Sequence, residues 1–156
     1  MSACGYSMVT GGAVALTAAT AKSVLGIKAH ANSGVHIKSL EVAFDGVTAS
    51  AVPVLVELCY ATFATNSPGT ASTSVTPAQV YGRALTVGFT AGKTWTTEPT
   101  SLTVLKELLL PADKGVLAYQ FPLGQEPDSA LAEGFVIRCT APAGVNVRAS
   151  LLAERI

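Results

Sequence analysis

The chain has 156 residues, which suits a single domain, and its 10 Lys and Arg residues balance its 10 Asp and Glu residues. It contains no basic block of the kind that marks a nucleic-acid-binding surface, and no apolar run approaches the roughly 18 residues of a membrane span. We therefore expect neither nucleic acid nor a membrane as a partner.

The N-terminal residues 1–12 are mostly small and polar, and they end in Gly11-Gly12. They predict an arm that precedes a single domain at residues 13–156. Chain termini are usually loose unless something holds them. Because this arm has few large apolar anchors, we expect a neighbouring subunit to hold it.

Alternation of apolar and polar residues, the main sequence signal for strands, recurs through the rest of the chain. The predicted strands cover residues 13–17, 23–30, 35–44, 52–60, 80–89, 100–110 and 116–121 and both halves of 134–156. Ile37 breaks the parity of its strand, which predicts a bulge near Lys38 and Ser39. Residues 61–79 and 90–99 are predicted loops, and the first of them is a surface excursion that covers a partner.

Residues 100–110 also fit the spacing of a short helix, which stays open as an alternative. Pro111 and a turn signal at residues 113–115 favour a strand that pairs with residues 116–121. The clearest pattern is at residues 134–156, where two alternating arms flank Ala141-Pro142-Ala143-Gly144. These arms predict an antiparallel hairpin. About eight strands without a long helix indicate an all-β protein, an antiparallel β-sandwich of the jelly-roll type with long loops.

Motifs for catalysis or cofactor binding are missing from the sequence, which contains no phosphate-binding glycine loop, CxxC or HExxH. His30 and His36 make a weak metal-ligand set without a nearby carboxylate or Cys. Glu41 and Glu57 are the only carboxylate pair that neighbouring strands could bring together for glycoside cleavage. We therefore expect no cofactor, no metal and no enzymatic activity.

Three cysteines, an odd number at wide spacing, argue against a disulfide framework and for synthesis in a reducing compartment. Cys59 and Cys139 lie inside strand patterns and are predicted to be small buried hydrophobes.

Charged residues make up only 13% of the chain, against about 25% in an average domain. Near-zero charge favours association, so we expect other subunits to cover much of the surface; a monomer with a Ser- and Thr-rich exterior is the alternative. Arg138 and Arg148 should be neighbours in the final hairpin and should reach acids of this or another subunit, unless they are simply solvated. Aromatic side chains in loops suit interfaces, although they can also fold back onto their own core. The candidate interface residues are Tyr6, Phe63, Tyr81, Trp95, Arg138 and Arg148.

Four segments resemble minor capsid or head-decoration (cement) proteins of tailed bacteriophages. Residues 122–155 read PLGQEPDSALAEGFVIRCTAPAGVNVRASLLAER, and the likeness extends to FDGVTASAVPVLVELCYATFATN at 44–66, VYGRA at 80–84 and TEPT at 97–100. The resemblance implies a β-rich protein that binds the assembled capsid, often as a trimer or dimer. It transfers no functional residue.

The sequence therefore leads to the hypothesis of a non-enzymatic virion protein on the outside of a phage head, made and assembled in the host cytoplasm. Its expected partners are itself, as a homotrimer or alternatively a dimer, and the major capsid protein. One alternative is a tail or fibre component whose loops bind a receptor or carbohydrate at a cleft lined by Trp95 and Tyr81. Another is a trimeric jelly-roll enzyme or ligand-binding module, which would need a pocket with converging polar groups.

Overall fold

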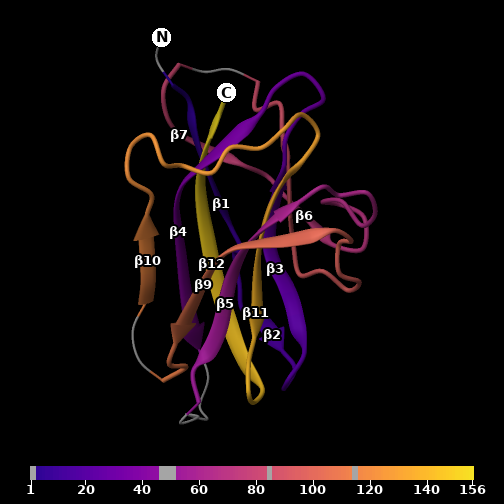
Figure 1. Cartoon of the computed structure of the whole chain (residues 1–156), viewed down its shortest axis with the longest axis vertical. Coiled ribbons are helices and arrows are strands. Elements are labelled where there is room, and N and C mark those ends of the chain that lie inside the picture. The colour runs from indigo at the N-terminus through magenta and orange to yellow at the C-terminus, as the bar shows by residue number, and fades with distance from the viewer. Residues whose placement is uncertain (1–2, 46–51, 84–85, 114–115) are drawn as a thin grey trace.

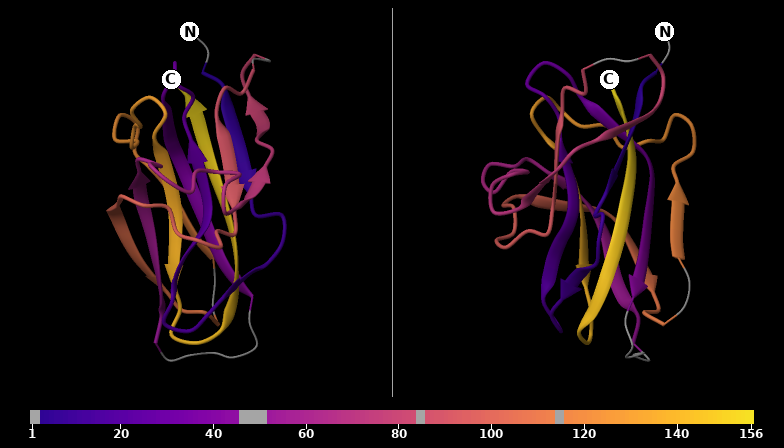
Figure 2. Two further views of the ribbon diagram at one scale, coloured as in Figure 1. Left: turned by 90° about the vertical axis from the view of Figure 1, so that its right-hand side faces the viewer. Right: turned by 180° about the vertical axis from the view of Figure 1, so that it is seen from behind.

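The computed structural model describes residues 3–45, 52–83, 86–113 and 116–156 as two antiparallel sheets packed face to face (Figures 1 and 2). The described residues form no helix, and thus none that could span a membrane. The strands are β1 (Gly5–Val9), β2 (Val14–Leu16), β3 (Ala21–Lys28), β4 (Val35–Asp45), β5 (Val54–Ala61), β6 (Thr73–Val75), β7 (Ala78–Tyr81), β8 (Thr90–Lys93), β9 (Leu102–Leu110), β10 (Val116–Gln120), β11 (Gly134–Thr140) and β12 (Val145–Arg155).

The sheet that we call sheet A has the strand order β10-β4-β12-β1-β7, and β2 also pairs with β12. Sheet B has the order β6-β8-β3-β11-β5-β9. Seen edge-on, the two sheets form separate layers (Figure 2, left). The predicted antiparallel all-β sandwich is confirmed, with 12 described strands in place of about eight. Its jelly-roll character stays a prediction.

The main core lies between the two sheets and follows from alternation along the central strands. In β12, Val147 and Leu151 are buried while Arg148 between them is exposed. On the facing sheet, Phe135 and Ile137 of β11 are fully buried. Burial of each such side chain contributes about 1.5–3 kcal/mol, so this interior holds the two sheets together.

A second, smaller core covers the outer face of sheet B. It contains Cys59, Ala61, Phe63, Trp95 and Val136. The loop that follows β5 closes over it, and the indole nitrogen of Trp95 donates a hydrogen bond of 2.8 Å to the carbonyl of Asn66 in that loop. The long loop after β5 therefore packs on its own sheet, and its contact with a partner stays a prediction.

The predicted C-terminal hairpin is wrong. β11 pairs with β3 and β5 in sheet B, whereas β12 pairs with β1, β2 and β4 in sheet A. The segment between them, residues 141–144, carries the chain from one sheet to the other. Alternation correctly identified both strands, but it does not specify which strand lies beside which, and here the two buried faces oppose each other across the core.

The predicted arm is a strand of the sandwich. β1 pairs with β12 on one side and with β7 on the other, and the side chains of Tyr6 and Met8 are buried. Its own chain therefore holds this segment, and a neighbouring subunit is not needed to order it. Residues 1–2 of the predicted arm lie outside the described residues.

Two further predictions concern strands at the edges. Residues 100–110 contain a strand rather than a helix, but β9 pairs with β5 and β10 pairs with β4, so they are not partners. Thr90–Lys93, predicted as loop, is strand β8, whose pairing with β3 and β6 compensates for its weak sequence pattern. Residues 114–115 of the predicted turn lie outside the described residues. The bulge in β4 is confirmed, because the register opposite Leu152 and Ala153 passes from Ser39 to Ile37 and skips Lys38.

Candidate functional site

The outer face of sheet A carries polar side chains on adjacent strands. Residues opposite one another in an antiparallel pair share a face. Glu41 lies opposite Ser150, which in turn lies opposite Val9 on β1. One step further along, Ser39 lies opposite Leu152. Glutamate, serine and aliphatic side chains therefore share this face.

Two adjoining hollows in this face form what we call the sheet A trough. They have volumes of about 400 Å³ and 230 Å³, and they share Glu41 and Ser150 in their linings. Val116 of β10 lines the larger hollow and Val80 of β7 lines the smaller one. The trough therefore runs across β4, β12 and β1, with exposed valines toward both edges of the sheet.

A break in the first strand creates the larger hollow. β1 and β2 both pair with β12, but residues 10–13 between them leave the sheet. Gly11 adopts a left-handed backbone with φ of 67°, which glycine accepts without steric cost. The amide of Thr10 donates to the carbonyl of Ala149 at 3.0 Å, and Lys93 Nζ donates to the Thr10 carbonyl at 2.5 Å. These bonds fix the position of the break.

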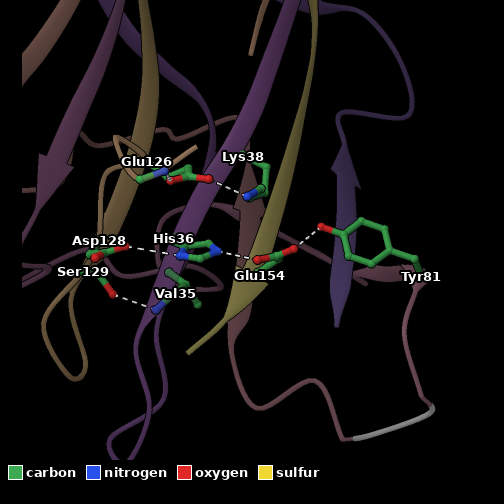
Figure 3. Close-up of polar contacts among 9 residues, drawn as sticks. Val35, His36, Lys38, Tyr81, Glu126, Asp128, Ser129 and Glu154 are labelled. Atoms are coloured by element: carbon green, nitrogen blue, oxygen red, sulfur yellow. Dashed lines mark hydrogen bonds and ion pairs between the residues drawn. The ribbon is translucent and has the colours of Figure 1, made fainter. Parts of the chain in front are cut away.

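A polar network closes one end of the same face (Figure 3). His36 lies between two carboxylates, with Nε2 2.5 Å from Glu154 Oε2 and Nδ1 3.3 Å from Asp128 Oδ1. The hydroxyl of Tyr81 donates a hydrogen bond to the other oxygen of Glu154. Burial raises the pKa of Glu154. The hydrogen bonds from Tyr81 and His36 together lower this pKa by more than burial raises it, so it lies below the ordinary value of a glutamate. The network joins β4, β12, β7 and the connection that precedes β11.

An ion pair beside this network uses the bulged residue of β4. Lys38 Nζ lies 2.5 Å from Glu126 Oε1 (Figure 3). The hydrogen bond from Lys38 holds the pKa of Glu126 down at about 2, and the same bond raises the pKa of Lys38. The amide of Gly124 also donates to Glu126, at 2.6 Å. The pair therefore attaches the connection before β11 to sheet A.

The ring of Tyr81 lies over Gly5 on this face. A Cβ atom on Gly5 would lie 2.3 Å from the ring of Tyr81, so only glycine leaves room for the phenol to reach Glu154. Burial, and then the hydrogen bond to Glu154, raises the pKa of the Tyr81 hydroxyl well above its ordinary value. Tyr81 thus stays a neutral donor at physiological pH.

The outer face of sheet B carries a separate ion pair. Arg138 donates from Nε to Glu57 Oε1 at 3.1 Å and from Nη2 to Glu57 Oε2 at 3.3 Å. Glu57 also lies opposite Glu107 of β9 in the register. The bond to Glu57 raises the pKa of Arg138. Arg138 is therefore a structural partner of its own sheet.

Several predicted pairings of chemical groups are wrong because their strands belong to different sheets. Arg138 lies in sheet B and Arg148 in sheet A, and the same division separates Glu57 from Glu41. Neither the arginine pair nor the carboxylate pair can therefore form.

His30 and His36 also have separate partners: Nδ1 of His30 accepts a hydrogen bond of 3.2 Å from the amide of Asn32. Across the part of the chain that the structure describes, no three His, Cys, Asp or Glu side chains are placed to hold a metal.

The six candidate interface residues divide into a buried and an outward-facing group. Tyr6 is buried and packs edge-on against Phe89, with ring centroids 5.4 Å apart. Phe63 and Trp95 are buried in the smaller core. These three cannot contact a partner, because their own chain covers them. Arg138 is held by Glu57, while Tyr81 and Arg148 both lie on the outer face of sheet A.

All three cysteines are free and buried. The burial predicted for Cys59 and Cys139 is confirmed. Desolvation raises the pKa of Cys59 to about 11 and that of Cys139 to about 12. Both thiols therefore stay protonated at neutral pH and act as small apolar side chains.

Edge strand β9 exposes large apolar side chains, and we call it the apolar flank, formed by Val104, Leu105 and Leu109. Leu109 is 66% exposed, Leu105 47% and Val104 37%. Lys106 lies 4.2 Å above the ring of Tyr119 on β10, so β9 and β10, edge strands of the two sheets, are adjacent. Leu105 is bulged, because the register passes from Lys106 to Val104. A bulge discourages simple addition of another strand at this edge.

No family model, curated protein or solved structure matches this chain. Sequence patterns placed Tyr81 and Arg148 among the candidates, but they did not reveal the network of His36 and Glu154. The alternation of side chains between the two faces of a strand could have revealed this network. Once β4 and β12 are paired, it places His36, Glu41, Ser150 and Glu154 on one face.

Proposed function

We propose that this protein is a structural virion protein, a decoration or cement protein that binds the outer surface of a bacteriophage head. The observation that carries the proposal is the apolar flank, since a monomer in water gains nothing by exposing Val104, Leu105 and Leu109 on one edge strand. The low charge of the chain and the resemblance of its segments to decoration proteins support the same conclusion.

The protein would stabilise the head by physically linking its subunits. Copies of the protein would associate through the apolar flank, as a homotrimer or alternatively as a dimer, and would bridge neighbouring subunits of the major capsid protein. Obligate interfaces of this kind bury more than about 2,000 Å² and are more apolar than transient ones. Closed symmetry would limit the assembly to a defined number of copies.

Structural roles account for the groups that an enzyme would use. The carboxylate of Glu57 is held by Arg138, and both nitrogens of His36 face carboxylates. The linings of the two hollows of sheet A contain no aromatic residue, and Trp95 is buried. These observations favour a decoration protein over a fibre component with a sugar-binding cleft lined by Trp95.

The test uses heads purified without this protein from the phage that encodes it. Purified protein should co-sediment with the heads, saturate at a fixed ratio and raise the temperature at which they disassemble. Sedimentation equilibrium of the protein alone should give a trimer or dimer at micromolar concentration.

The variant L105S/L109S should weaken self-association, head binding or both, because it makes the apolar flank polar. The matched control is L123S, since Leu123 is 91% exposed but lies in the connection after β10. A wild-type protein that stays monomeric and leaves heads unchanged would refute the proposal.

A further inference from the structure

We infer that the sheet A trough binds an extended segment of a partner polypeptide that places a Lys or Arg side chain on Glu41. The inference rests on the proposed function only in naming the partner as the shell protein of the head. The binding chemistry itself comes from the shape and the charge of the trough.

The shape suits a polypeptide backbone. The two hollows join at Glu41 and Ser150 and cross three adjacent strands. The floor carries Ser39 and Ser150, whose hydroxyls can donate to or accept from a passing main chain. Exposed Val116 and Val80 lie toward the two edges of the sheet. An extended segment that crosses the face would meet apolar contacts at its ends and hydroxyls at its centre.

The acid at the centre of the trough is Glu41, which lines both hollows. Glu41 is exposed, and its carboxylate has no hydrogen bond or ion pair among the described residues. The next acid on the same face, Glu154, is already held by His36 and Tyr81. Arg148 also lines the trough but has an interaction of its own. A cation from the occupant would therefore complete the electrostatics of this face.

Other classes of ligand fit less well. A sugar would need aromatic side chains to stack on, which the linings of both hollows lack. A phosphate backbone that followed the trough would be repelled by Glu41 in the smaller hollow, which no cation among the described residues lines. Addition of a strand to a sheet edge is a different mode, because the trough lies on a sheet face. A basic, extended peptide segment is the chemistry that remains.

The experiment compares lysine substitutions at two exposed positions, Glu41→Lys inside the trough and Gln125→Lys in the connection after β10, outside both the trough and the apolar flank. Binding of each protein to heads that lack it is measured by co-sedimentation at two salt concentrations. We expect E41K to weaken head binding at least about tenfold and Q125K to leave it within about twofold. The E41Q variant should fall between E41K and wild type.

A second arm makes the two proposals separable. The probe is a synthetic octapeptide of alternating Val and Ser with one central Arg, titrated to millimolar concentration against ¹⁵N-labelled protein. The amides of Gly11, Gly12 and Ser150 should shift, and they should not shift with a central Glu in place of Arg or with E41K protein.

The outcomes divide cleanly. If wild type binds heads and E41K binds equally well, the trough inference is overturned and the proposed function stands. If wild type binds no heads but the Arg peptide shifts the trough amides, the proposed function fails and the trough inference survives. An E41K protein that changes only its self-association would show that the trough binds a second copy, which also overturns the inference. Peptide shifts outside the trough, or none, would overturn it too.

Discussion

Removal of Arg138 should be among the most damaging single changes outside the main core. In the variant R138M, the Glu57 carboxylate keeps its buried position but loses both donors, and its side chain is only 6% exposed. Glu107 remains opposite it in the register. Breaking a buried ion pair on one side costs about 3–5 kcal/mol. Because Arg138 itself is 23% exposed, we expect a loss near the lower end, about 3 kcal/mol.

Urea unfolding followed by the fluorescence of the only tryptophan, the buried Trp95, measures this loss directly. The double variant E57L/R138M should recover most of the stability, since an apolar pair often replaces a buried ion pair without loss. The reasoning fails if R138M loses less than about 1 kcal/mol, or if the double variant is no more stable than R138M.

Two further predictions concern the network on sheet A. In Gly5→Ala the new Cβ would displace the ring of Tyr81, so the phenolic pKa of Tyr81, raised in the wild type, should fall toward 10.0; ultraviolet titration against Y81F measures it, and an unchanged curve contradicts the contact. The pKa of Glu126 is lowered from 4.5 to about 2, so its contribution to stability is present above pH 4.5 and is lost as the pH falls toward 2. Melting temperatures across this range should therefore depend less on pH in E126Q, and equal slopes would show that the pair with Lys38 is not formed.

The strands that sequence patterns predicted best are those with one buried face. In β4, Ile37 breaks the alternation of apolar and polar residues, and this break predicted the bulge at Lys38. An extra, unpaired residue at the bulge lets the side chain of Ile37 point into the core. In β9, the side chains alternate between partly covered and exposed from Lys106 to Leu110, which a helix would not do. Alternation of apolar and polar residues indicates which side chains are buried and which are exposed. It therefore predicted strands reliably where one face of the strand is buried and the other is exposed.

The same signal could not assign partners. β11 is buried on both faces because the loop with Phe63 and the side chain of Trp95 cover Val136, and nothing in its local sequence shows that cover. β8 is only Thr90–Lys93 with Gly92 inside it, and it is a strand because β3 pairs with it. The trough depends on the register between β4, β12 and β1. The sequence therefore showed that Glu41 is a polar residue in a strand, but it could not predict that Glu41 lies opposite Ser150.

The position of β12 has a consequence for how the protein is made. β12 lies between β4 and β1 in sheet A, and Gly5 pairs with Glu154. The ribosome must therefore pass Arg155 before β1, β2 and β4 meet their shared neighbour. At about 5–20 residues per second, the earliest strand waits on the order of ten seconds with its edge open. A nascent chain of this design needs protection by a chaperone or by the partly formed sheet B, and a late translational pause would lengthen its exposure to aggregation.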